Sequence, residues 1–208
     1  MAEVFSDLSL INDEYLSGLF DAEGWTNLTF SENSKLKMGI APKPIVEIKL
    51  GHRYFCGLFD GEGNIDVSLL EHPEMAMGIQ AMPRMRLVMS NGWQLLSKIK
   101  EKYGGHIRKS KVCRNGAEWY VSDLEGVERM ADILLRNCIV KRPQLLIMKY
   151  IVLPLIKRGE HRTPQGLLAL IEIQKRMNSG KGGIKDWREI LLRKLKEKGL
   201  LERYKLGG

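Results

Sequence analysis

The chain has 208 residues, of which 44% are hydrophobic and 28% charged, as in folded globular proteins and unlike intrinsically disordered ones. Its longest apolar stretch, Leu145–Ile156, is too short to cross a bilayer, and its first residues lack the pattern of a secretory signal. Three scattered cysteines without a CxxC pair argue against a disulfide framework and a structural zinc site. We therefore expect an intracellular protein, in the cytoplasm or an organelle matrix, with no membrane partner.

The net charge of +8 is unevenly distributed along the chain. Met1–Arg53 has 5 basic and 8 acidic residues, whereas Arg84–Arg114 has 9 basic residues and a single acidic one. A local basic cluster of this size is typical of proteins that bind a polyanion such as nucleic acid. A solvated basic surface with no such partner explains the charge alone equally well.

An internal repeat begins near the amino terminus. Tyr15–Leu50 and Tyr54–Met89 align without a gap at an offset of 39, and 12 of the 36 aligned positions are identical. The most similar segments are GLFDAEG at Gly18–Gly24 and GLFDGEG at Gly57–Gly63. Similarity at this level indicates a duplicated unit.

Each copy of the unit is predicted to form a helix followed by two strands. The helices cover Tyr15–Phe20 and Tyr54–Phe59, and each ends in an acidic turn with glycine. The first strands, Trp25–Phe30 and Asn64–Leu69, alternate apolar and polar residues with a period of two, as half-buried strands do. The second strands are predicted at Ile45–Leu50 in the first copy and at Arg84–Met89 in the second.

The chain beyond the repeat continues the same pattern. We predict, in order, a helix over Gly92–Tyr103, a hairpin of His106–Cys113 and Glu118–Ser122, a helix over Asp123–Cys138, an apolar helix from Pro143 to about Ile156 with a kink or stop at Pro154, a helix from Pro164 to near Gly180, and a last helix with Asp186 as its cap. Tyr54–Cys138 therefore has the order αββαββα, of which the first copy contains only the opening αββ. The predicted units are residues 1–50, 51–182 and a basic carboxy-terminal helix in 183–208.

The two repeat helices have small residues four positions apart, Gly18 with Ala22 and Gly57 with Gly61. Such spacing lets two helix backbones pack closely, and a side-by-side pair would bring the acidic residues at both helix ends together. Clustered carboxylates repel one another unless cations lie between them, so we expect divalent metal ions at this position. Metal ions held by carboxylates beside a basic strand surface are suited to phosphodiester hydrolysis. Alternatively, these acids cap the following strand or pair with Lys and Arg.

Leu16–Gly24 (LSGLFDAEG) and Phe55–Gly63 (FCGLFDGEG) resemble the nonapeptide motif of the LAGLIDADG homing endonucleases. The whole of Tyr54 to about Gly180 resembles one domain of that family, and Tyr15–Leu50 resembles only the opening of a domain. The resemblance implies an α+β fold: a saddle in which two motif helices form the central interface and antiparallel strands line a DNA major groove.

The resemblance also implies a metal site. Glu23 and Glu62 would bind Mg²⁺, with Mn²⁺ able to substitute, assisted by the backbone carbonyls of Ala22 and Gly61. The acids two positions before these glutamates, which stabilise the helix end in the family, are Asp21 and Asp60.

The family lysine near the active site falls on Lys141, where it would act electrostatically or position solvent; a plain phosphate contact is an equal alternative. We expect DNA contacts from outward strand residues, with Arg suited to guanine edges and Lys to phosphates. These residues are Asn64, Asp66, Ser68, Arg84, Arg86, Arg108, Lys109, Lys111 and Arg114.

Two questions stay open at this level. The motif helix Tyr54–Gly63 pairs either with Tyr15–Gly24 of the same chain or with its own copy in a second chain; the short link between the two copies slightly favours the homodimer, in which Glu23 is not a ligand. The implied function is that of a metal-dependent, intron-encoded endonuclease that makes a staggered break in double-stranded DNA. The alternatives are a maturase that binds its host intron RNA and a DNA-binding descendant that does not cleave.

Overall fold

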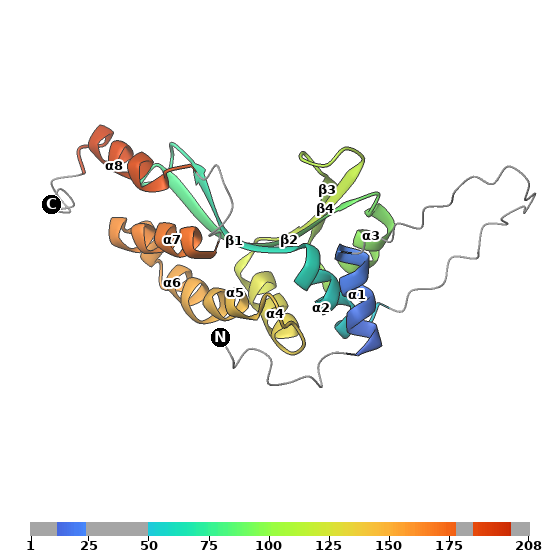
Figure 1. The fold of residues 1–208 in the computed structure, drawn as a ribbon. Helices are drawn as coiled ribbons and strands as arrows, with labels where there is room; N and C mark the ends of the chain where they lie inside the picture. Colours follow the sequence, from blue (N-terminus) through green and yellow to red (C-terminus); the bar gives the residue numbers. More distant parts are fainter. Residues whose placement is uncertain (1–11, 24–49, 178–184, 201–208) are drawn as a thin grey trace, which may run out of the picture.

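A computed structural model describes residues 12–23, 50–177 and 185–200, and a four-stranded antiparallel sheet lies at its centre (Figure 1). The strands follow the spatial order β1-β2-β4-β3. Their bounds are β1 Gly63–Glu71, β2 Ile79–Ser90, β3 His106–Lys109 and β4 Gly116–Val121. The sheet and the αββαββα order from α2 to α4 confirm the predicted fold class. The strands predicted for the first copy of the repeat lie outside the described residues.

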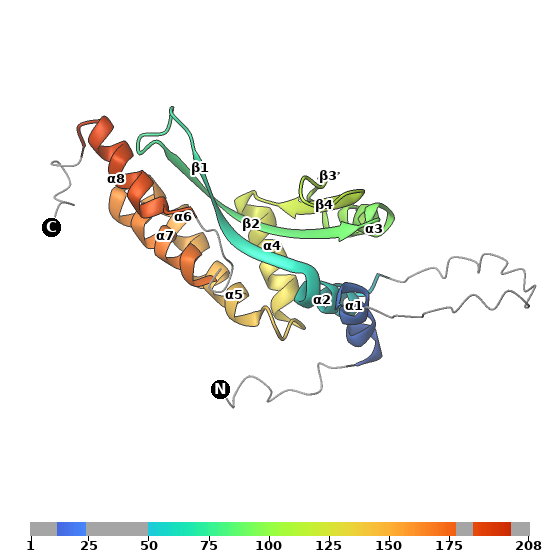
Figure 2. The ribbon, with the colours of Figure 1, turned by 45° about the horizontal axis from the view of Figure 1, so that its top comes forward.

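The helices α4 to α7 lie along one face of the sheet, and α1 lies beside α2 at one end of it (Figures 1 and 2). None of the helices in the described ranges is long and apolar enough to cross a lipid bilayer. The helix bounds are α1 Asp13–Glu23, α2 His52–Glu62, α3 Trp93–Tyr103, α4 Leu124–Leu135, α5 Arg142–Ile147, α6 Leu153–Lys157, α7 Pro164–Met177 and α8 Trp187–Glu197. A π-helical segment, Met148–Val152, joins α5 to α6, and a 3₁₀ turn, Glu160–Arg162, precedes α7.

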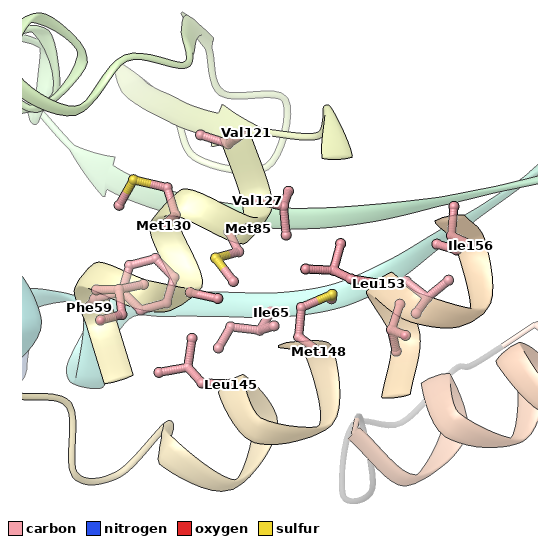
Figure 3. Close-up of a cluster of buried hydrophobic side chains, with 14 of the residues drawn as sticks. Phe59, Ile65, Met85, Val121, Val127, Met130, Leu145, Met148, Leu153 and Ile156 are labelled. Carbon is pink, nitrogen blue, oxygen red and sulfur yellow. The ribbon is translucent and has the colours of Figure 1, made fainter. Parts of the chain in front are cut away.

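The core forms where the apolar face of the sheet meets the helices. Alternate residues of each strand point to the same face of a sheet, so the period-two pattern places Ile65, Met85 and Val121 on one side. Helix residues such as Phe59 of α2 and Met130 of α4 pack against them (Figure 3). This buried cluster covers one face of the sheet, and the polar residues of the strands lie on the opposite face.

Strand β2 begins five residues earlier than the predicted strand, which started after Pro83. Proline cannot donate a hydrogen bond and normally ends a central strand. Here β2 pairs with β4 only from Met85 onward, so Pro83 lies where β2 has β1 as its single neighbour. The alternation of buried residues continues through this point, from Ile79 and Ala81 into the predicted strand.

The apolar helix ends at Lys157, close to its predicted end near Ile156, and it continues through Pro154 instead of stopping there. Proline removes one backbone donor and its ring clashes with the carbonyl of the residue four positions earlier. The π-helical segment immediately before Pro154 changes the bonding, with the Leu153 N–H donating to the Met148 carbonyl five residues back. This wider turn accommodates the proline within a continuous helical rod.

The predicted cap and hairpin form with small differences. Asp186 accepts hydrogen bonds from the backbone N–H groups of Arg188 and Glu189 at the start of α8, which confirms it as the cap. The hairpin of β3 and β4 also forms, but its connection, residues 110–115, is longer than a tight turn. Ser110 and the left-handed Asn115 lie at the two ends of this loop.

Candidate active site and nucleic-acid interface

The two motif helices pack backbone to backbone through their glycines. A Cβ atom placed on Gly57 would lie 2.0 Å from the carbonyl oxygen of Tyr15, and one placed on Gly18 would lie 2.0 Å from the carbonyl oxygen of Tyr54. Gly18 faces the turn Tyr54–Leu58 and Gly57 faces the equivalent turn Tyr15–Leu19, which places the crossing point at the two glycines. Gly51, just before α2, faces Glu14 at the start of α1, so the helices run in the same direction. Their carboxy-terminal ends, at Glu23 and Glu62, therefore lie on the same side of the crossing point (Figure 1).

This pairing differs from the slightly favoured homodimer interpretation. The glycine face of α2 is covered by α1 of the same chain, so a second copy of α2 cannot occupy that face at the same time. Both copies of the repeat present the same small residues, so α1 can pack on α2 as well as a second copy of α2 can. The helix of the same chain has the advantage because it is covalently linked to α2. The first repeat is therefore not an appendage, because its helix supplies half of the central interface.

Asp60 connects the motif helices to the segment that precedes α5. Its side chain is 2% exposed and accepts three hydrogen bonds, from the Tyr15 hydroxyl at 2.6 Å, the Ile139 N–H at 2.6 Å and the Lys141 N–H at 2.8 Å. Burial, together with the Asp60 carboxylate, raises the pKa of Tyr15, so its hydroxyl stays protonated and donates. Asp60 thus stabilises the helix end, as the resemblance implied, and fixes the backbone of Lys141 beside it.

Replacing Asp60 with Asn is expected to lower the free energy of unfolding by about 1–3 kcal/mol, because an amide nitrogen cannot accept and leaves a buried donor unpaired. Urea denaturation measures the effect. Asp132→Asn, which breaks the more exposed ion pair with Lys149, is the matched control and should cost less than about 1 kcal/mol. Equal stability losses in the two variants would contradict the role assigned to Asp60.

The predicted metal ligands lie at the helix ends, but they are described to different extents. Glu62 is exposed at the last position of α2, directly after Gly61, and its motif neighbour Asp60 holds the backbone of Lys141. Ala22 and Glu23 form the end of α1, and their side chains lie outside the described residues, as does that of Asp21. Within the described part of the chain, no three His, Cys, Asp or Glu side chains converge on a common metal position.

The polar face of the sheet carries most of the residues predicted to contact DNA. Cross-strand partners share a face, so the register of Asn64 with Arg86, Asp66 with Arg84, and Arg108 with Glu118 places all six on one surface. Ser68 belongs to the same face. We call this surface the groove face; its charged and polar residues are Asn64, Asp66, Ser68, Gln80, Arg84, Arg86, Ser90, His106, Arg108, Glu118 and Tyr120.

The arginines of the groove face are held by acidic side chains. Asp66 binds Arg84 through both oxygens, at 3.1 Å from Nε and 2.9 Å from Nη2. Glu118 binds Arg108 in the same way, at 3.0 Å from each of the same two nitrogens. Arg86 lies between these pairs, 3.3 Å from the Asn64 amide oxygen and 3.8 Å from Glu118. Two of the three arginines are therefore fixed in orientation.

Three predicted contacts lie elsewhere. Lys109 pairs with the buried Ala117 in the sheet register, so it projects from the face opposite the groove face, and its prediction as an outward groove residue is wrong. This strand was predicted to run from His106 to Cys113, whereas β3 ends at Lys109. Lys111 and Arg114 are exposed in the loop between β3 and β4.

Glu118 and Tyr120 were not selected from the sequence, although they lie at the centre of the groove face. The Tyr120 ring stacks under the Arg108 guanidinium, whose central carbon lies 4.7 Å from the ring centroid. The signal was present in the period-two pattern of β4, where Glu118 and Tyr120 alternate with the buried Trp119 and Val121.

Comparison with solved structures finds homing endonucleases. The homing endonuclease I-TnaI is 26% identical with a TM-score of 0.58, over 71% of this chain and 97% of that chain. The archaeal intron-encoded homing endonuclease I-Vdi141I, solved with DNA, is 21% identical with a TM-score of 0.61, over 72% and 96%. The LAGLIDADG homing endonuclease I-LtrWI, bound to its target DNA, is 20% identical with a TM-score of 0.58, over 64% and 46%.

The chain has the LAGLIDADG homing endonuclease fold. No protein-family model and no curated protein sequence matches the chain, so the likeness is carried by structure. Within this fold, the motif helices α1 and α2 lie at the end of the sheet where β1 begins (Figure 2).

Proposed function

We propose that the protein is a LAGLIDADG homing endonuclease that cleaves double-stranded DNA in a sequence-specific, metal-dependent manner. The observation that carries the proposal is the glycine-mediated packing of α1 on α2, which directs the ends of both motif helices to one side beside a polar sheet face. The DNA complexes among the solved structures with this fold, I-Vdi141I and I-LtrWI, add support. Duplex DNA is the proposed substrate and a staggered double-strand break the proposed product.

The donor set at the helix ends suits Mg²⁺. Mg²⁺ retains several waters and binds proteins through one or two carboxylates together with substrate phosphates, so a cluster of three protein ligands is not required. Asp60 is not assigned as a ligand, because its side chain is buried and its oxygens accept hydrogen bonds from Tyr15, Ile139 and Lys141. Glu62 and the Gly61 carbonyl would hold one ion, and Glu23 and the Ala22 carbonyl the other.

A bound divalent cation would supply an activated water and neutralise negative charge at the phosphate. The residues of the chain do the positioning: Asp60 fixes the end of α2, and its hydrogen bond to the Lys141 N–H holds that residue beside the same helix end. From there Lys141 would act electrostatically on the phosphate or on the attacking solvent.

The proposal is tested by selecting duplexes from a randomised pool in Ca²⁺ and then incubating the bound duplexes with Mg²⁺. We expect Mg²⁺ to produce cuts at one position in both strands, Mn²⁺ to replace it, and Ca²⁺ or chelator to give none. Binding of selected duplexes without cutting in Mg²⁺ or Mn²⁺ would contradict the proposed activity and leave a DNA-binding protein that does not cleave.

Binding should also depend steeply on salt, because Lys and Arg side chains that contact phosphates release counterions. Raising salt from about 50 to about 200 mM should weaken binding by about a thousandfold, measured by fluorescence anisotropy with a selected duplex. Lys111→Gln should reduce the slope of log affinity against log salt by about one, whereas Lys157→Gln, on α6 and paired with Glu128, should leave it unchanged. A flat salt response would argue against DNA binding through phosphate contacts of exposed Lys and Arg side chains.

A further inference from the structure

The groove face contains two nearly buried carboxylates, although a surface that binds a polyanion gains affinity from positive charge alone. Asp66 is 7% exposed and Glu118 is 4% exposed, and both belong to the strands that form this face. A negative side chain here opposes binding to phosphates, so its presence requires a compensating role. That role follows from how the two carboxylates hold their arginines.

Each carboxylate occupies one particular edge of a guanidinium group. Asp66 and Glu118 accept from Nε and Nη2, which leaves the edge formed by Nη1 and Nη2 able to donate two parallel hydrogen bonds. The exposed fractions show which partner points outward: 23% for the Arg84 side chain against 10% for Asp66, and 43% for Arg108 against 5% for Glu118. In each pair the arginine is therefore the more exposed partner, and its second edge is not used by the carboxylate.

In the major groove, guanine presents two adjacent acceptors, O6 and N7, and is the base that a bidentate arginine matches. On the basis of the proposed function, we propose that Arg84 and Arg108 each read a guanine, and that Asp66 and Glu118 are positioning residues that set this specificity. Tyr120 supports Arg108 from below through its ring. A phosphate can also accept two hydrogen bonds from this edge, so the preference for one base is the property that distinguishes guanine reading from a phosphate contact.

The sheet register gives an approximate spacing for the two bases. Glu118 is opposite Val88, four residues beyond Arg84 on β2, and Arg108 lies one strand further out. Four residues along a strand and two strand spacings place the two arginines roughly 16 Å apart. At about 3.4 Å per base, this corresponds to guanines about five base pairs apart, on either strand of one half of the target.

The experiment uses the full chain and a pool of duplexes with a randomised centre, with bound duplexes recovered in Ca²⁺ and sequenced. We expect the wild-type consensus to contain two guanines about five base pairs apart. Arg84→Lys should reduce the preference for one guanine, and Arg108→Lys for the other, each by about tenfold or more, with affinity for unselected duplex nearly unchanged. Arg158→Lys, which follows α6 and is paired with Glu160, is the matched control and should alter neither position.

The positioning role has its own readout. Asp66→Asn should relax the same base position as Arg84→Lys, and Glu118→Gln the same position as Arg108→Lys. The double variant Asp66→Asn with Arg84→Lys should show no further loss, because the carboxylate acts through the arginine. Thermal melting checks that each variant folds; if a carboxylate variant does not fold, the two Arg→Lys variants, which keep the charge, still decide the proposal.

The results of these experiments distinguish a failure of this inference from a failure of the proposed function. A consensus without guanine at this spacing, or guanine preferences that persist in both Arg→Lys variants, overturns the inference even if Mg²⁺-dependent cutting occurs. Position-specific loss of guanine preference in a protein that never cuts supports the inference and overturns the proposed endonuclease activity. Failure to recover any consensus overturns the guanine reading outright.

Discussion

Glu62→Gln is expected to abolish DNA cleavage, by about a thousandfold or more in rate, while leaving DNA binding intact. The substitution preserves the shape of the side chain at the end of α2 but removes the negative charge that a hard cation requires. Because Glu62 lies on the surface of the helix end and is not part of the buried core, its loss should not affect folding. Single-turnover cleavage of a selected duplex in Mg²⁺ and anisotropy binding in Ca²⁺ measure the two effects separately.

Glu101→Gln is the matched control for this experiment, since it removes the same charge from an exposed position on α3. It should cut at the wild-type rate. Cleavage by Glu62→Gln at a rate similar to that of Glu101→Gln would show that Glu62 holds no catalytic cation, and the metal site would have to be sought elsewhere.

Gly57→Ala is expected to destabilise the protein by about 3 kcal/mol or more, because the added methyl group overlaps the Tyr15 carbonyl oxygen and the helices must separate. For a chain of this size the loss corresponds to a fall of about 10 °C in the thermal midpoint, measured by circular dichroism. Gly18→Ala should have a similar effect, because its methyl group meets the Tyr54 carbonyl oxygen at the equivalent point. Increased hydrogen exchange in α1 would locate the damage at the helix pair.

The control is Gly199→Ala at the end of α8, where a Cβ atom meets nothing within 4 Å and only the left-handed backbone is penalised. That penalty is about 1–2 kcal/mol, so the control separates backbone strain from helix contact. If Gly57→Ala loses stability but Gly18→Ala does not, then α1 does not pack on α2 in solution, and a second chain becomes the better candidate for the partner of α2.

The sequence predicted the order of the elements from helix α2 to helix α4 because each strand there is buried on one face. Ile65, Val67 and Leu69 alternate with polar residues, and such alternation identifies both the strand and its inner face. The helix through Pro154 was harder to predict, because a proline normally stops a helix and the π-helical turn that accommodates it has no simple pattern in sequence.

The contacts between the candidate site residues could not be predicted from the sequence. The identical glycine pattern of the two repeats could not show whether α2 pairs within the chain or between chains, since both helices present the same surface. The pairing of Asp66 with Arg84 depends on the register of β1 and β2, which is set by where the connection between them turns. Glu118 was missed because a search for DNA contacts favours basic residues, and its importance lies in the arginine that it holds.

The ion pairs of the groove face also affect how the protein would search a genome. Three arginines on this face are offset by two carboxylates, so its formal charge is far lower than the count of basic residues suggests. Such a surface would release an arbitrary sequence quickly, because non-specific affinity comes chiefly from phosphate neutralisation. A genome offers roughly 10⁶–10⁹ competing sites. Short residence times at non-matching sites would let the protein test many sites quickly, and only a matching site would be bound tightly.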